Sequence, residues 1–299
     1  MDKKLKIGIV GGDRRIIKVS SVLDKLKYDV KVWGIDNTYF ETDLCVSTCE
    51  EAVSDADVVI LPTPPSEDEV RINCPLFSGE SGIKFYKLLE LLPKKAIILG
   101  GRMSPRFKDI ASKHNFKTYD YFNREELLIK NAVPTAEAAI GIAIDKFPKT
   151  LFGSHVAVLG FGRIGETLAS KLNLLGAKVT VFARKNASIA KAQSMGVNGR
   201  KIAFSNNVST LGELSQGYDI IYNTVPYWII TEDILKNISK STLIIDLASA
   251  PGGMDIVAAK KYEINIIHAL SLPAKTAPES AGVIIAESIL NIIEEEGVI

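Results

Sequence analysis

Three glycines with the spacing Gly-x-Gly-x-x-Gly follow a short apolar stretch and open an amphipathic one. In such a pattern the first glycine permits a tight turn, the second lets the backbone approach a phosphate, and the third lets the next helix pack closely on the strand. Free N–H groups at the start of that helix bind phosphates. The pattern therefore predicts a dinucleotide-binding turn, against the alternative of a glycine-rich turn without function. The predicted contact residues are Gly160, Phe161, Gly162, Arg163, Ile164 and Gly165.

The next predicted strand, residues 178–183, ends in Arg184-Lys185. A site for NAD carries an acidic residue at this place, which holds the ribose 2′-OH, whereas a guanidinium binds a 2′-phosphate through two parallel hydrogen bonds. The two cations therefore favour NADP(H), and Ser188 is a further expected donor to the phosphate. In the alternative interpretation, Arg184 is only a solvated loop residue.

Two later segments follow predicted strands. We expect both beside the nicotinamide, because the carboxyl ends of parallel strands meet at the ligand-binding edge of a sheet. The residues concerned are Thr224, Val225 and Pro226 in one segment, and Ala248 and Ser249 in the other.

The three histidines provide no clear acid–base catalyst. D-2-hydroxyacid dehydrogenases share the two-domain plan expected here, and they carry a catalytic His in a Pro-His pair just before the last helix. In this chain Pro278 is followed by Glu279, which argues against a 2-hydroxy acid substrate. His268, at the end of the last predicted strand, is either a proton carrier or a hydrogen-bonded structural residue. His155 is interpreted as structural and His114 as exposed.

Apolar strand-like runs alternate with amphipathic helical stretches, a pattern typical of parallel sheets covered by helices on both faces. The predicted strands are 5–10, 30–34, 58–61, 96–99 and 117–119 in the first half, and 155–159, 178–183, 219–223, 243–247 and 265–268 in the second. The predicted fold class is α/β, with two Rossmann-like domains. Residues 62–81 are expected to form a long loop at a ligand-binding edge.

The first domain is expected over residues 1–133 and the NADP-binding domain over residues 134–275. Two helices would link the domains across a cleft. One begins at Pro134 or Thr135 and runs to about Ile144. The other is the final helix, about residues 278–295 within the segment 276–299, which is expected to pack back on the first domain.

The composition is that of a globular protein: 46% of the 299 residues are hydrophobic and the formal net charge is +1. Without a basic surplus, nucleic-acid binding is not expected. No stretch approaches the roughly 20 apolar residues that span a bilayer and no signal peptide is recognisable, so we expect a cytoplasmic protein without membrane contact. Cys45, Cys49 and Cys74 are interpreted as reduced, partly buried thiols and not as a disulfide or metal site.

Motifs in both halves resemble the family of dipicolinate synthase A subunits from spore-forming bacteria, almost from end to end. They are Gly11-Gly12-Asp13-x-Arg15, Asn131-x-Val133-Pro134-Thr135-x-Glu137, Val156-Ala157-Val158-Leu159-Gly160-Phe161-Gly162-Arg163-x-Gly165, Asn223-Thr224-Val225-Pro226, Asp246-Leu247-Ala248-Ser249-x-Pro251-Gly252-Gly253, and Leu272-Pro273 followed by Ala277-Pro278-x-x-Ala281-Gly282.

The resemblance implies oxidation of dihydrodipicolinate, or of its hydrated tetrahydro precursor, to dipicolinate with NADP⁺. It also implies that a separate B subunit is the partner and that the mother cell of a sporulating bacterium is the location; a homodimer is left open. Two alternatives remain: another NADP-dependent two-domain dehydrogenase acting on a small carboxylate, and a non-catalytic NADP(H)-binding subunit.

A ring with two carboxylates needs cations in its site, and Arg15, Arg102 and Lys275 are expected at strand-end loops facing the cleft. Asp13 or Glu137 would accept the proton that the ring loses. In the alternative interpretations Asp13 only caps the following helix, Glu137 belongs to a capping box, and Arg15 lies on the surface. No metal ligand is expected.

Overall fold

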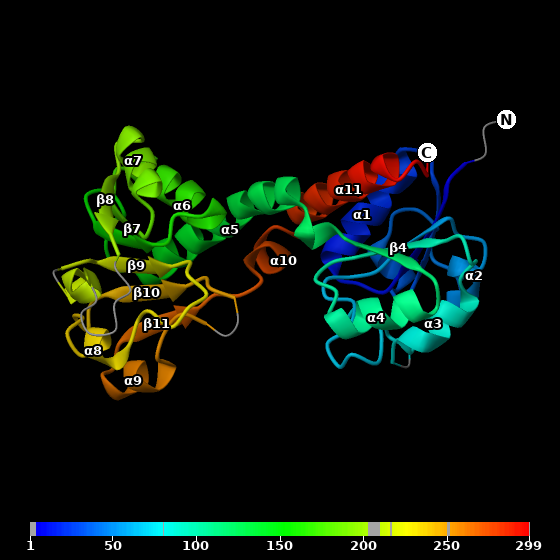
Figure 1. The fold of residues 1–299 in the computed structure, drawn as a ribbon, viewed down its shortest axis with the longest axis horizontal. Helices are drawn as coiled ribbons and strands as arrows, with labels where there is room; N and C mark the ends of the chain where they lie inside the picture. Colours follow the sequence, from blue (N-terminus) through cyan, green and yellow to red (C-terminus); the bar gives the residue numbers. More distant parts are fainter. Residues whose placement is uncertain (1–3, 80, 203–209, 216, 250–251, 299) are drawn as a thin grey trace. The chain divides into compact units, whose positions relative to one another are not determined.

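The computed structural model describes residues 4–79, 81–202, 210–215, 217–249 and 252–298. The chain divides into two compact units, Met1–Asn131 with Ala277–Ile299, and Ala132–Thr276. In each unit the described residues form one all-parallel sheet with helices on both faces (Figure 1). The predicted fold class, α/β with two Rossmann-like domains, is confirmed. The boundaries expected from the sequence fall after residues 133 and 275.

The sheet of the first unit has the strand order β2-β1-β3-β4-β5, and every neighbouring pair is parallel. The order reverses between β1 and β3, and open sheets of this kind bind ligands at such a point, outside the carboxyl ends of the strands. The strands are β1 (Lys6–Val10), β2 (Asp29–Trp33), β3 (Val58–Ile60), β4 (Ile97–Gly100) and β5 (Lys117–Asp120).

Two layers of helices bury both faces of this sheet, which explains why β3 and β4 are apolar throughout. On one face α1 and α11 lie side by side (Figure 1), and α2, α3 and α4 cover the other. The helices are α1 (Arg14–Lys25), α2 (Cys49–Val53), α3 (Phe85–Leu91), α4 (Pro105–Lys113) and α11 (Pro278–Glu295).

The sheet of the second unit has the order β11-β10-β9-β6-β7-β8. Numbered from β6, this is the 3-2-1-4-5-6 arrangement of dinucleotide-binding folds, whose order reverses between β6 and β9. The strands are β6 (His155–Leu159), β7 (Lys178–Ala183), β8 (Asn198–Lys201), β9 (Ile220–Asn223), β10 (Leu243–Asp246) and β11 (Asn265–His268).

Helices α5, α6 and α7 bury one face of the second sheet, and α8 and α9 bury the other. A further short helix, α10, follows β11 and ends the unit. The helices are α5 (Glu125–Lys146), α6 (Arg163–Leu174), α7 (Asn186–Ser194), α8 (Glu232–Leu235), α9 (Ile256–Lys261) and α10 (Leu272–Thr276).

Helix α5 corrects one expectation, because it begins at Glu125 and contains Pro134, where the sequence suggested a helix start. A proline inside a helix lacks an N–H and costs about 3 kcal/mol. Burial offsets this cost: Leu127 packs in the core of the first unit, and Ala139 and Ala143 pack in the core of the second.

The interpretation of Glu137 as part of a capping box is therefore wrong, since Glu137 lies in the middle of α5. Strand β8 was not predicted, because its sequence Asn-Gly-Arg-Lys has no apolar alternation and lies at the exposed edge of the sheet. Strands β6, β7 and β11 and helix α11 have the predicted bounds.

Candidate active site

The glycine turn after β6 has the geometry that a dinucleotide needs. Gly160 has a φ of +91°, and a Cβ there would lie 2.5 Å from Thr224 Oγ1. A Cβ on Gly165 would lie 2.3 Å from the Gly160 carbonyl oxygen, so a side chain would force α6 away from β6. A Cβ on Gly162 would meet nothing within 4 Å, so the backbone is open on this side.

The start of α6 also fits an anion. Gly162 is its N-cap, and no side chain caps the helix. The first N–H groups of a helix have no partner within the helix, and they carry the positive end of its dipole. Beside the open side of Gly162, these groups suit a pyrophosphate, with Phe161, Arg163 and Ile164 as its neighbours in sequence.

Thr224 joins the end of β9 to this turn, because both its N–H and its Oγ1 donate to the Leu159 carbonyl, at 2.9 and 2.8 Å. Val225 and Asn223 then close a tight turn with two reciprocal hydrogen bonds. Pro226 and Ser249 are exposed, and Ala248 is buried with its N–H donating to Asp246. Pro251, in the same predicted segment as Ser249, lies outside the described residues.

Arg184 and Lys185 follow β7, the strand paired with β6, and both are exposed. Lys185 is the N-cap of α7, and Ser188 lies half-buried in the first turn of that helix. The two cations and the positive end of the helix dipole lie together at the strand end where a dinucleotide fold holds the adenosine ribose.

A row of three polar side chains, two buried and one exposed, crosses the carboxyl ends of β9, β10 and β11. Asn223, Asp246 and His268 are register partners on the three strands. Asn223 Nδ2 donates to Asp246 Oδ1 at 2.9 Å, and His268 Nδ1 lies 3.1 Å from Asp246 Oδ2. The Asp246 side chain is 1% exposed and that of His268 38%. His268 is thus hydrogen-bonded to Asp246, a residue inside the predicted strand 243–247 whose contact with His268 the sequence did not reveal.

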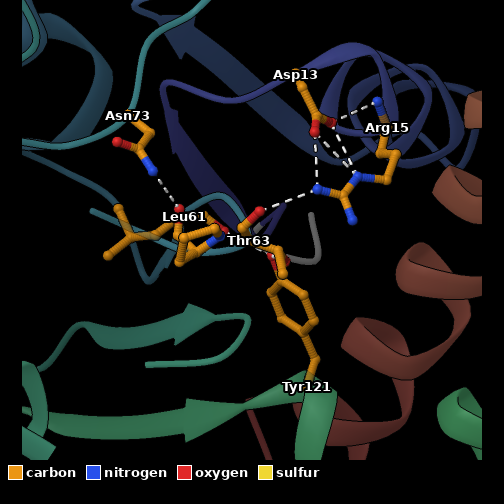
Figure 2. A network of polar contacts seen from close by, with 7 residues as sticks. Asp13, Arg15, Leu61, Thr63, Asn73 and Tyr121 are labelled. Carbon is orange, nitrogen blue, oxygen red and sulfur yellow. Dashed lines mark hydrogen bonds and ion pairs between the residues drawn. The ribbon is translucent and has the colours of Figure 1, made fainter. Parts of the chain in front are cut away.

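In the first unit, Asp13 and Arg15 are partners (Figure 2). Asp13 is the N-cap of α1, and its Oδ1 accepts from the Arg15 N–H at 2.9 Å. The Arg15 guanidinium donates to both Asp13 oxygens, with Nη2 at 2.7 Å from Oδ2. Nη2 also donates to the Thr63 carbonyl at 3.0 Å. Asp13 therefore caps the helix as the sequence suggested, and Arg15 is held at the sheet edge with its side chain only 12% exposed.

A buried tyrosine anchors the loop that receives Arg15 (Figure 2). Tyr121 OH donates to the Leu61 carbonyl at 2.8 Å and accepts from Thr63 Oγ1 at 2.9 Å. Burial raises the pKa of Tyr121 well above its usual range, so it stays a neutral donor. Asn73 Nδ2 donates to the Pro64 carbonyl at 2.9 Å. No sequence pattern marks this network, because its members lie far apart along the chain.

Arg102 comes to the same edge from the end of β4. Its φ of +55° is left-handed, and Asp120 holds this turn by accepting from the N–H groups of Arg102 and Met103, both at 2.9 Å. The guanidinium lies 5.2 Å from the centre of the Phe122 ring. Among the described residues, no carboxylate forms an ion pair with it.

Two cations converge at this edge. Burial, and next the positive charge of Arg15, lower the pKa of Arg102, while Asp120 opposes the shift. An anion placed between the two guanidiniums would remove their repulsion and accept hydrogen bonds from both.

A cavity of about 440 Å³ opens between the loops that follow β1 and β3, where the strand order reverses. Of the residues described, the charged ones that line it are Asp13, Glu67, Asp68 and Arg71, and neither Arg15 nor Arg102 is among its lining residues. Arg71 belongs to the predicted long loop, which contains no helix or strand in its described part, residues 62–79 and 81. Its Nη1 donates to the Gly82 carbonyl at 3.0 Å, and the sequence reasoning missed it.

Glu137 and Lys275 belong to the second unit, whereas Asp13, Arg15 and Arg102 belong to the first. Glu137 is exposed on α5 and forms an ion pair with Lys171 of α6 at 2.8 Å. Lys275 is exposed on α10.

The three cysteines are free in the structure. Burial raises the pKa of Cys49 and of Cys74 to about 12, so both thiols stay protonated near neutral pH. Among the described residues, no group of three or more His, Cys, Asp or Glu side chains is arranged to hold a metal ion.

The comparisons with known proteins distinguish the two units. The family model of the N-terminal domain of dipicolinate synthase A subunits matches residues 6–122, and that of the NAD binding domain of D-isomer specific 2-hydroxyacid dehydrogenases matches residues 143–251. Over 293 residues the chain is 33% identical to the dipicolinate synthase A subunit of Bacillus subtilis, covering 97% of this chain and 96% of that one. The chain belongs to the family of dipicolinate synthase A subunits.

Solved structures agree with this assignment. The dipicolinate synthase A subunit from Bacillus halodurans has a TM-score of 0.86 at 27% identity, covering 97% of this chain and 99% of that one. The A chain of the Bacillus subtilis enzyme also has a TM-score of 0.86, at 31% identity, with 99% and 97% covered. A transhydrogenase from Sinorhizobium meliloti, with a TM-score of 0.70 at 14% identity over 97% and 94% of the two chains, shares the fold.

The resemblance that the motifs suggested is therefore confirmed. As a member of the family of dipicolinate synthase A subunits, the chain has a dehydrogenase fold and a domain for a nicotinamide dinucleotide. Among the described residues, only α5 is long and apolar enough to cross a membrane, and its alanines pack in the core of the second unit.

Proposed function

We propose that this family member oxidises dihydrodipicolinate, or its hydrated tetrahydro precursor, to dipicolinate with NADP⁺. It would act with a B subunit in the cytoplasm of the mother cell of a sporulating bacterium. The observation that carries the proposal is that Arg15 and Arg102 both lie beside Thr63 at one edge of the first sheet: Arg15 donates to the Thr63 carbonyl, and Arg102 follows Gly101, where a Cβ would lie 2.0 Å from Thr63 Oγ1. The unit that holds them is the one matched by the dipicolinate synthase model.

The two guanidiniums suit the carboxylates of a small ring. Asp13 and the Thr63 carbonyl hold Arg15 along its Nε and Nη2 side, and Nη1 has no partner among the described residues. A carboxylate would accept from the free side and from Arg102. Asp120 fixes the backbone at Arg102 through its N–H, and the exposed Arg102 side chain has its guanidinium 5.2 Å from the centre of the Phe122 ring.

The cofactor would be held in the second unit. Gly160, Gly162 and Gly165 would receive the pyrophosphate, and Arg184, Lys185 and Ser188 the 2′-phosphate that distinguishes NADP⁺ from NAD⁺. Bound nicotinamide would supply the hydride acceptor. This chain's own residues would bind the carboxylates, orient the ring and accept a proton.

The direct test is an assay with freshly prepared dihydrodipicolinate, NADP⁺, the chain and its proposed B subunit, from which each component is omitted in turn. We expect dipicolinate and NADPH to appear in equal amounts only in the complete mixture. Tight NADPH binding without either product would instead support a non-catalytic cofactor-binding subunit. NADPH formed from other carboxylates but not from dihydrodipicolinate would point to a different dehydrogenase.

A further inference from the structure

The proposed reaction needs a proton acceptor, and the two carboxylates expected for this role already pair with cations. Both oxygens of Asp13 accept hydrogen bonds from Arg15. Glu137 forms an ion pair with Lys171 on neighbouring helices. Other titratable side chains at the carboxyl edges of the two sheets are therefore the better candidates.

His268 and Asp246 have the arrangement of a general base and the residue that orients it. The Asp246 carboxylate is buried, and besides His268 it accepts from Asn223 Nδ2 and the Ala248 N–H. A carboxylate held in this way favours the imidazole tautomer with hydrogen on Nδ1, which donates to it. The lone pair is then on Nε2, and the His268 side chain is 38% exposed.

The position of His268 also suits the reacting end of the cofactor. β6 carries the pyrophosphate turn, and β7, on one side of it, carries Arg184. The nicotinamide half of a dinucleotide extends to the other side, over β9 and beyond. His268 ends β11, three strands from β6, which is roughly 14 Å at the usual spacing of strands.

We infer that His268, oriented by Asp246, is the catalytic base that accepts the proton released by the substrate ring. This inference rests on the proposed function. Oxidation of the dihydro ring removes two hydrogens. One leaves a ring carbon with its bonding pair, as hydride to the nicotinamide. The other leaves a neighbouring ring atom as a proton to His268 Nε2, and the electrons of the broken bond form the new π-bond of the aromatic ring.

Asp246 stabilises the imidazolium that results, and the exposed ring can pass the proton to water. Asp246 is the charged group that faces His268 from β10, the strand paired with β11. The balanced reaction is dihydrodipicolinate and NADP⁺ giving dipicolinate, NADPH and one proton. The tetrahydro precursor would first lose water and then follow the same step.

The His268→Asn variant tests this role sharply. The Asn amide can replace Nδ1 as donor to Asp246, but it has no basic nitrogen at the place of Nε2. In the complex with the B subunit we expect kcat to fall by about 10²- to 10⁴-fold. The NADPH Kd and the substrate KM should change less than about threefold. The matched control is His155→Asn, an exposed histidine at the amino-terminal edge of the same sheet, which should leave kcat unchanged.

A kcat of His268→Asn within about threefold of the wild type would overturn the inference while leaving the proposed function intact. A wild-type complex that forms no dipicolinate would overturn both. If the variant does not fold, ¹⁵N NMR of the wild-type chain decides, because its three histidines are few enough to assign. Hydrogen on Nδ1 of neutral His268 supports the inference, and hydrogen on Nε2 overturns it.

Discussion

At the residue scale, we propose that cofactor choice depends on the two cations that follow β7. Arg184 stands where an NAD site has a carboxylate, and Lys185 starts α7 beside it. The sequence predicted the position of both residues correctly. Strand β7 has the predicted bounds, and the glycine turn before it identifies β7 as the second strand of the dinucleotide-binding domain. The selectivity between NADP(H) and NAD(H) remains a prediction.

Replacing Arg184 with Ala should weaken NADPH binding by about 1–3 kcal/mol, the scale for the loss of a charge-assisted hydrogen bond. NADH lacks the 2′-phosphate, so its affinity should hardly change. Calorimetric titration of both cofactors measures the difference. The control is Lys178→Ala at the exposed opposite end of β7, which should affect neither cofactor. Equal losses for NADPH and NADH in Arg184→Ala would contradict the 2′-phosphate assignment.

The residues that the sequence could not reveal are those whose roles depend on distant partners. Tyr121, Thr63 and Asp120 come together from the ends of β5 and β3, and no local pattern marks them. Asp13 and Arg15 were found because they lie two positions apart at a helix start. Even there, the sequence did not show that they pair with each other.

At the element scale, the turn after β4 acts as a support for Arg102. A Cβ on Gly101 would lie 2.0 Å from Thr63 Oγ1 and 2.5 Å from a Tyr121 ring carbon, so only glycine lets β4 end so close to β3. The Asp120 carboxylate then fixes the left-handed turn through the N–H groups of Arg102, Met103 and Phe122.

The variant Asp120→Asn should loosen this turn. In the wild type, both carboxylate oxygens of Asp120 accept from backbone N–H groups. In the variant, the amide NH₂ of the new Asn side chain replaces one of these oxygens and cannot accept, so a backbone N–H loses its partner. We expect the free energy of unfolding to fall by about 1–3 kcal/mol. The substrate KM should rise while NADPH affinity stays the same, because the turn belongs to the first unit. Denaturant unfolding and steady-state kinetics measure the two effects.

The matched control for this turn is Asp109→Asn, because Asp109 is exposed on α4 and its carboxylate pairs only with Lys113 among the described residues. It should lower stability by less than about 0.5 kcal/mol and leave KM unchanged. If Asp120→Asn destabilises the protein without raising KM, then Arg102 does not bind the substrate.

Elements with a clear apolar period could be predicted well, and elements decided by distant packing could not. β6, β7 and α11 follow directly from their patterns. Helix α5 was placed too late because Pro134 is a breaker by local rules, whereas burial of Leu127 and Ala139 in two different cores keeps it helical. Polar β8 pairs with β7 through its backbone alone, which leaves no side-chain signal.

At the scale of the whole molecule, the two units have complementary capacities. The first has converging cations and a cavity at its switch point, and the second has the glycine turn and the Asp246–His268 pair. The proposed oxidation requires both capacities to act on one substrate. A cleft in which the units cooperate was expected from the sequence, and it remains a prediction.

The central claim is that a dicarboxylate bound by the first unit reacts with a cofactor bound by the second. A crystal structure with NADP⁺ and dipicolinate tests it most directly. We predict the 2′-phosphate on Arg184, the carboxylates of dipicolinate on Arg15 and Arg102, and a ring carbon roughly 3–3.5 Å from the nicotinamide. Dipicolinate bound away from both arginines, or too far from the nicotinamide for hydride transfer, would contradict the account.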